Sequence, residues 1–266
     1  MYFNIIKAIN KKCYLLLFLL AAILLSGCAN NESQASPQRL DNVTGFNLHV
    51  NLAKQYVAIN NRDLARVHLD KAEKFIVQQH QKSQLYNAYA LLYQSESEFR
   101  LAEEYYRKGI KSNPNDSTVR YNFASFLFGQ KRYQKSIDEM LIVSSDLNYS
   151  RRPQAFYFVG MSQEKLGNYA AAVQAFKRTI VLSPQFLLGY LQLSKIYFLQ
   201  KQYQPAQAAM EYYMAQNTEL TAENVWLLIK INFALGDMDS VNDNGRLLTR
   251  LFPESSQVQK FTQLTQ

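Results

Sequence analysis

The fold is decided by a stretch of 34 residues, 153–186, which reads PQAFYFVGMSQEKLGNYAAAVQAFKRTIVLSPQF. Its pattern indicates two short helices joined by a tight turn at the letters LGNY. A small residue in each helix, Gly160 and Ala172, allows the two helices to cross closely, and Phe176 fills the wedge between them. Pro184 ends the unit, because proline tolerates a helix start but not a helix interior. The stretch therefore predicts a helical hairpin.

The same unit recurs along the chain. Aligned on the small residue of the second helix, the copies are 37, 34, 36, 34 and 35 residues apart. The aligned positions are Ala65, Ala102, Ser136, Ala172, Ala206 and Val241. Helical hairpins repeated about every 34 residues are the signature of the tetratricopeptide repeat (TPR). The predicted repeats span residues 46–79, 83–116, 117–150, 153–186, 187–220 and 222–255.

This repetition determines the fold class that we expect. One repeat cannot bury its apolar face alone, so neighbouring repeats must stack. We predict an all-α domain, a right-handed superhelix of about six TPR repeats over residues 46–266, with a concave inner surface. The composition agrees, because glycine and proline are sparse, at 9 and 6 residues, and 48% of the chain is hydrophobic.

The net charge is +8, and it argues against a nucleic-acid partner. Three of the excess positive charges, Lys7, Lys11 and Lys12, lie in an N-terminal leader without acidic residues, so removing the leader leaves +5. No run of Lys and Arg alternates with aromatic residues, as a nucleic-acid-binding stripe would. We interpret the remaining charge as that of an ordinary protein surface.

The leader, residues 1–27, has the organisation of a bacterial lipoprotein signal peptide. The three lysines precede an apolar run at residues 14–25, which is too short to span a bilayer comfortably. The sequence LSGC at residues 25–28 follows at once and resembles a lipobox. We therefore predict that Cys28 carries a covalent lipid, the only cofactor-like group that we expect. The alternative is a signal anchor with an incidental cysteine.

The residues after Cys28 predict where the lipid holds the protein. Ala29 stands where an aspartate would resemble the inner-membrane retention signal of Gram-negative bacteria, so we expect anchoring at the periplasmic face of the outer membrane. Cys13 is removed with the leader, and the mature chain then has no partner for a disulfide. Residues 28–45 are polar and lack apolar periodicity, which predicts a flexible tether between lipid and domain.

The first helix of each repeat is expected to line the concave surface. Places two, five, nine, twelve and thirteen of the unit should face this groove, and large apolar side chains fill many of them. Exposed apolar surface of this extent usually marks a partner site, here for a peptide segment or helix. Taken singly, any of these side chains could instead pack only against neighbouring helices. The predicted groove residues are Val50, Val57, Leu91, Tyr121, Phe128, Tyr157, Met161, Leu188, Leu191, Phe198, Trp226 and Phe233.

The sequence contains no recognisable catalytic or metal-binding set. His49, His68 and His80 show no metal-ligand spacing, and we interpret them as ordinary polar positions. Neither a Gly-rich phosphate loop nor a Gly-x-Ser-x-Gly nucleophile elbow occurs. We expect no metal and no enzyme activity, and we expect a monomer.

Three stretches are more specific than the repeats. The sequence YNFASFLFGQKRY at residues 121–133, the overlong connection at 146–153 and GRLLTRLFP at 245–253 resemble the type IV pilus pilotins of the PilF/PilW type. The resemblance covers about residues 47–261. It implies an outer-membrane lipoprotein that binds secretin subunits, brings them to the outer membrane and promotes their multimerisation for pilus biogenesis.

Two other functions stay open at this point. One is a different TPR lipoprotein scaffold of the outer membrane, serving outer-membrane protein assembly or cell-wall hydrolases. The other is a periplasmic enzyme or its regulatory subunit, against which the missing catalytic set argues.

Overall fold

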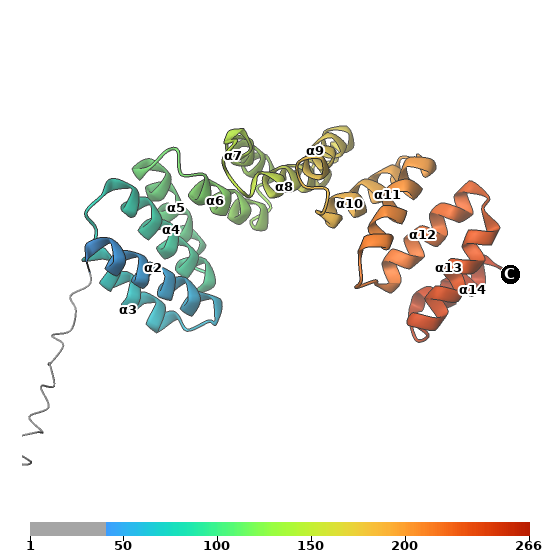
Figure 1. The fold of residues 1–266 in the computed structure, drawn as a ribbon, viewed down its shortest axis with the longest axis horizontal. Helices are drawn as coiled ribbons and strands as arrows, with labels where there is room; N and C mark the ends of the chain where they lie inside the picture. The colour runs from blue at the N-terminus through green and yellow to red at the C-terminus, as the bar shows by residue number, and fades with distance from the viewer. Residues whose placement is uncertain (1–40) are drawn as a thin grey trace, which may run out of the picture. The chain divides into compact units, whose positions relative to one another are not determined.

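The computed structural model describes residues 41–266. In this part of the chain, thirteen α-helices follow one another without any strand. The helices α2 to α14 lie in the compact unit Asn42–Gln266, where Figure 1 shows the successive hairpins in chain order. The predicted leader, the predicted lipidation site Cys28 and most of the predicted tether lie outside the described residues.

The helices pair into six hairpins, and a last helix follows them. The pairs are α2 (Asn42–Ala58) with α3 (Arg62–Glu73), α4 (Gln79–Ser95) with α5 (Phe99–Ser112), α6 (Ser117–Gly129) with α7 (Tyr133–Ser145), α8 (Arg152–Lys165) with α9 (Tyr169–Leu182), α10 (Leu187–Leu199) with α11 (Tyr203–Gln216), and α12 (Ala222–Leu235) with α13 (Met238–Leu251). The last helix is α14 (Ser256–Leu264). The predicted all-α class and the six hairpins are confirmed.

The hairpins close where the sequence places small residues. All six aligned residues of the second helices, from Ala65 to Val241, have 0% of their surface exposed. Where serine occupies such a crossing, its hydroxyl is satisfied: Ser136 Oγ donates to the Ala124 carbonyl at 2.8 Å. Ser194 Oγ donates to the Ala206 carbonyl at the same distance, 2.8 Å. Close approach therefore leaves no buried hydroxyl unpaired at these two crossings.

Each hairpin turn contains one residue with positive φ. Only two of the six turns use glycine for it, Gly167 and Gly236, both at φ 78°. The other four are Asn60, Ser97, Lys131 and Lys201, with φ between 58° and 62°. A residue with a side chain is strained in this left-handed region. At these four turns, the geometry that the hairpin requires therefore outweighs the preference of the residue for negative φ.

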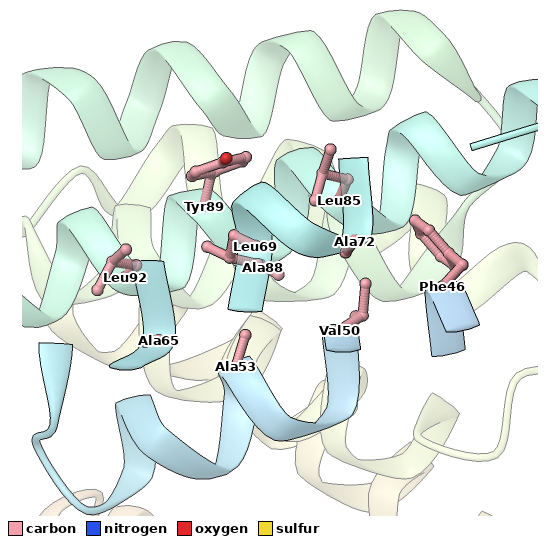
Figure 2. Packing of buried hydrophobic residues seen from close by; sticks show 10 residues of the cluster. All are labelled: Phe46, Val50, Ala53, Ala65, Leu69, Ala72, Leu85, Ala88, Tyr89 and Leu92. Atoms are coloured by element: carbon pink, nitrogen blue, oxygen red, sulfur yellow. The ribbon is translucent and has the colours of Figure 1, made fainter. Parts of the chain in front are cut away.

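The first repeat starts earlier than the sequence predicts. The tether was expected to reach Gly45, but α2 begins at Asn42, and Gly45 and Phe46 are already buried. A Cβ atom on Gly45 would lie 2.6 Å from the Phe75 ring, so the helix backbone packs directly on that ring. Figure 2 shows Phe46 within the first hydrophobic core, which α2, α3 and α4 share.

Side-chain contacts also join neighbouring repeats. Asp116 caps α6 by accepting from the Val119 amide at 3.2 Å, and it also accepts from Ser83 Oγ of α4 at 2.9 Å. Glu103 of α5 pairs with Arg132, before α7, at 2.5 Å. The Arg132 guanidinium is the main reason that the pKa of Glu103 falls to about 2.

The helices of residues 41–266 were also compared with the length and hydropathy of a membrane span. None of them combines enough length with enough apolar character to be a transmembrane helix.

Candidate protein-binding groove

We call the surface of the first helices of the hairpins, α2, α4, α6, α8, α10 and α12, the groove face. Two hollows open on it. The amide hollow lies over α2, α4, α6 and the α7–α8 connection, and its lining includes Asn51, Lys54, Asn87, Asn122, Tyr149 and Arg151. The lysine hollow lies over α8, α10, α12 and α14, and its lining includes Lys195, Phe198, Leu199, Trp226, Lys230 and Lys260.

Polar side chains dominate the amide hollow. Asn122 Nδ2 donates to Asn87 Oδ1 at 3.0 Å, linking α6 to α4. Burial lowers the pKa of Lys54, and the nearby Asp116 carboxylate opposes that shift. Amide side chains offer both donors and acceptors, so this surface suits the backbone of an extended peptide. Its two parts have cavity volumes of about 250 Å³ and 360 Å³.

The lysine hollow is larger than either part of the amide hollow, and it combines cations with apolar surface. Its cavity volume is about 490 Å³. The Lys230 ammonium lies 5.1 Å from the centre of the Phe198 ring, a cation–π contact between α12 and α10. Burial and the positive charge of Lys260 lower the pKa of Lys230. Trp226 lines the same hollow and is the one tryptophan of the chain.

Five of the predicted groove residues lie where a partner can reach them. Leu91 lines the amide hollow. Phe198 and Trp226 line the lysine hollow. Leu188 and Phe233 are 47% and 43% exposed. These five side chains, which were predicted from their places in the repeat, therefore have surface that is accessible to a partner.

Val50 and Leu191 are mainly core residues, although Val50 also borders the amide hollow. They are only 3% and 6% exposed, and Figure 2 shows Val50 among the packed side chains of the first core. Both occupy the fifth place of their repeat, as Asn87 does at 2% exposure. The neighbouring helices cover this place, so only a longer side chain there, such as Trp226 or Tyr157, keeps part of its surface open. The prediction of the fifth place as a groove position was therefore wrong for Leu191, and Val50 offers the amide hollow only a small part of its surface.

The other predicted residues pack between helices with only part of their surface open. Tyr121 and Phe128 meet the Phe158 ring edge-on, with centroid distances of 5.8 Å and 5.5 Å. The long α7–α8 connection covers Tyr121, because the Tyr149 ring lies 6.1 Å away and the Arg151 guanidinium lies over it. The remaining three are likewise half-buried against core clusters: Val57, Tyr157 and Met161.

The apolar pattern of the repeats does not predict the polar residues of the groove face. The ninth place of the repeat holds lysine three times, at Lys54, Lys195 and Lys230. All three lysines line the two hollows. The recurrence of a cation at one repeat position was the available signal.

His49 and His68 also differ from the expectation of ordinary polar positions. Their Nδ1 atoms lie 3.0 Å apart, between α2 and α3. The Tyr56 ring stacks on His68 at 5.3 Å, and Phe75 lies 5.6 Å from His49. Burial lowers the pKa of both imidazoles, with the Lys71 charge adding to the effect. Among residues 41–266, no three His, Cys, Asp or Glu side chains gather to hold a metal.

Comparisons with known proteins identify the class. The tetratricopeptide-repeat family profile matches residues 83–116 and 153–186, the second and fourth predicted repeats. Together with the hairpins and the groove face, this match defines an all-α superhelical TPR protein.

Comparisons with individual proteins give a more specific relationship than the repeat family. The chain is 28% identical over 250 residues to "Type IV pilus assembly protein PilF" of Pseudomonas aeruginosa, which covers 92% of this chain and 96% of PilF. A solved structure of P. aeruginosa PilF superposes with a TM-score of 0.72 at 25% identity, covering 84% of this chain and 99% of PilF. PilW, described as a widely conserved type IV pilus biogenesis factor, superposes with a TM-score of 0.66 at 24% identity, covering 81% and 97%. The chain is homologous to PilF, and it shares its TPR fold with PilF and PilW.

Proposed function

We propose that this protein is a lipid-anchored adaptor of type IV pilus biogenesis, a pilotin that binds secretin subunits and promotes their multimerisation in the outer membrane. The observation that carries the proposal is the match to the pilus assembly protein PilF, which spans 92% of this chain and 96% of PilF. A match of this extent includes every repeat rather than the generic TPR positions alone.

In the proposed mechanism, three parts of the chain have separate roles. Acyl chains on Cys28 hold the protein at the periplasmic face of the outer membrane, since each buried methylene contributes about 0.8 kcal/mol. The polar residues after Cys28 act as a tether that lets the domain extend away from the membrane. The groove face binds a segment of the secretin subunit, and anchoring then raises the local concentration of subunits at the membrane.

The groove face supports an adaptor rather than an enzyme. Its hollows offer amide groups, lysines and partly exposed aromatic rings, which suit a polypeptide segment. Within the described part of the chain, no cluster of metal-ligating side chains accompanies them. The partner that we propose for this surface is another protein.

The partner is tested by co-purification. The tagged full-length protein is extracted from its host with detergent, and the co-purifying proteins are identified by mass spectrometry. We expect the type IV pilus secretin, and deletion of the gene should lower the amount of detergent-resistant secretin multimer while monomer accumulates. Capture of outer-membrane assembly factors or cell-wall hydrolases, with normal secretin multimers, would replace the pilotin function with the other scaffold function.

The anchor is tested separately with Cys28→Ser. This variant should not label with a palmitate analogue and should leave the outer-membrane fraction, because no thiol remains for acylation. The repeat domain should keep its helix content, since Cys28 precedes it. Equal labelling of the variant and the wild type would refute the lipoprotein assignment.

A further inference from the structure

The two hollows of the groove face differ in how their lysines are balanced. In the amide hollow, the Asp116 carboxylate acts on Lys54 and favours its charged form. In the lysine hollow, the charge that acts on Lys230 is that of a second cation, Lys260. The lysine hollow therefore has a second cation acting on Lys230, where the amide hollow has a carboxylate acting on Lys54.

The ion pairs of the domain agree with this difference. Across residues 41–266, none of the six ion pairs involves Lys195, Lys230 or Lys260. Two carboxylates, Glu164 and Glu223, also line the hollow. Glu223 Oε1 accepts a hydrogen bond from Gln257 Nε2 at 3.1 Å, which ties it to α14. Three ammonium groups thus face two carboxylates, and the excess charge is positive.

Apolar surface lies beside these cations. Leu199 is 62% exposed, and the rings of Phe198 and Trp226 are partly exposed. Phe233, seven residues after Trp226 on α12, is 43% exposed on the same side of the helix. Tryptophan and other aromatic side chains at the centre of a recess, with charged groups around them, are typical of binding hot spots.

We propose that the lysine hollow binds a segment of a partner protein in which a carboxylate side chain stands beside a large apolar side chain. The carboxylate lies among Lys195, Lys230 and Lys260, and the apolar side chain lies against Trp226 and Leu199. A volume of about 490 Å³ accommodates such a pair of side chains. The inference rests on the proposed function in that it takes the groove face as the surface that binds the partner.

The shape of the site favours a peptide over a membrane. The three lysines come from α10, α12 and α14 and converge on a recess. An anionic bilayer presents a flat surface, which can meet the exposed Lys260 but not the partly buried Lys195, Lys230 and Trp226. A side chain projecting from a polypeptide enters the recess, so an acidic protein segment is the occupant that fits.

The test uses the fluorescence of Trp226, because the chain has a single tryptophan. The full-length protein in detergent is titrated with two peptides that differ only in charge: acetyl-Gly-Ser-Glu-Phe-Glu-Leu-Gly-amide and the same peptide with glutamine replacing both glutamates. We expect a saturable change in emission and at least about fivefold tighter binding of the acidic peptide. Raising the salt from about 0.05 M to about 0.5 M should weaken the acidic peptide selectively.

Variants of the chain locate the effect. Lys230→Gln should reduce the preference for the acidic peptide at least about threefold, and Lys260→Gln, at an exposed position, should do the same without risk to the fold. Lys111→Gln, an exposed lysine at the end of α5, is the matched control and should change nothing. Circular dichroism melts verify that each variant is folded.

Three results would overturn the inference: equal affinity for both peptides, no saturable response, or a response to phosphatidylglycerol vesicles without any response to peptide. The peptide experiment contains no secretin, so it is independent of the proposed function. If the acidic peptide is not preferred but a secretin still co-purifies, the proposed peptide site is wrong and the pilotin function stands. If the acidic peptide is preferred but no secretin co-purifies, the pilotin function is wrong and the proposed peptide site stands.

Discussion

The ring of Phe176 packs directly on the backbone of Gly160. A Cβ atom at residue 160 would lie 2.6 Å from ring atom Cε1 and 2.7 Å from Cδ1. No real side chain tolerates such distances, so the first helix of this repeat can cross the second only without a side chain at residue 160. The hairpin that identified the fold therefore depends on one glycine and one ring.

Gly160→Ala should destabilise the domain by about 1–3 kcal/mol, because the Phe176 ring must move out of a packed core. Gly129→Ala is the matched control, since Gly129 ends α6 and nothing lies within 4 Å of its Cβ position. That change should stabilise by up to about 1 kcal/mol, because alanine favours helix. Urea unfolding followed by circular dichroism measures both, and equal signs for the two variants would contradict the packing argument.

The hairpin turns give a second prediction, of opposite sign. Lys201 has φ 58° in the α10–α11 turn, where the α8–α9 turn has Gly167 at φ 78°. Lys201→Gly should stabilise the domain by about 0.5–1 kcal/mol, because relief of the left-handed strain exceeds the added entropy of the unfolded chain. Gly167→Ala should destabilise by about 1 kcal/mol. The measurement is the thermal midpoint, and a lower midpoint for Lys201→Gly would show that its side chain makes a stronger contact elsewhere.

The repeat period made the hairpins predictable because the tightest crossings admit only small residues. Ala65, Ala102 and Ala172 align by their spacing in the sequence alone, and each is fully buried. Place in the repeat does not fix exposure equally well, because exposure also depends on the length of the side chain. Val50 and Trp226 share the fifth place, yet Val50 is 3% exposed whereas part of Trp226 remains open.

Contacts that bridge elements without a periodic signal could not be predicted. His49 and His68 are 19 residues apart, and they meet only because α2 and α3 pack together in one hairpin. Tyr121 was expected to be open to the groove, and the α7–α8 connection covers it with Tyr149. The sequence marked that connection as overlong but contained no signal for the direction in which it folds.

The aromatic cluster at that connection gives a third prediction. The Phe158 ring meets Tyr121 and Phe128 at interplanar angles of 89° and 82°. The Tyr157 ring also meets Phe158 edge-on, at 80°. Phe158→Leu keeps most of the apolar volume but removes these three edge-to-face contacts, each contributing about 0.5–1.5 kcal/mol, so we expect about 1.5–4.5 kcal/mol of destabilisation. Phe233→Leu, at an exposed ring on α12, should cost less than about 0.5 kcal/mol. Urea unfolding tests both, and similar losses would show that the cluster is not cohesive.

The histidine pair makes the stability of the first repeat depend on pH. Burial lowers the pKa of both His49 and His68 below the ordinary value, and Lys71 acts in the same direction. The folded state then binds protons less tightly than the unfolded state, whose histidines titrate near about pH 6.5. The stabilisation is fully present above that pH and is lost as the pH falls through the lower folded pKa values.

The fourth prediction is that the thermal midpoint falls between about pH 7.5 and about pH 5, and that His68→Gln reduces this fall. Protonation of both rings removes the acceptor that the 3.0 Å contact between their Nδ1 atoms requires, and it places two positive charges beside Lys71. Glutamine cannot titrate, so the variant should be less stable than wild type at pH 7.5 but should lose less on acidification. His80→Gln is the control, since His80 is exposed at the start of α4 and makes neither ring contact nor histidine pair. Differential scanning calorimetry over the pH series provides the midpoints. If His68→Gln and His80→Gln show the same pH dependence as wild type, the pair does not control the acid sensitivity of the domain.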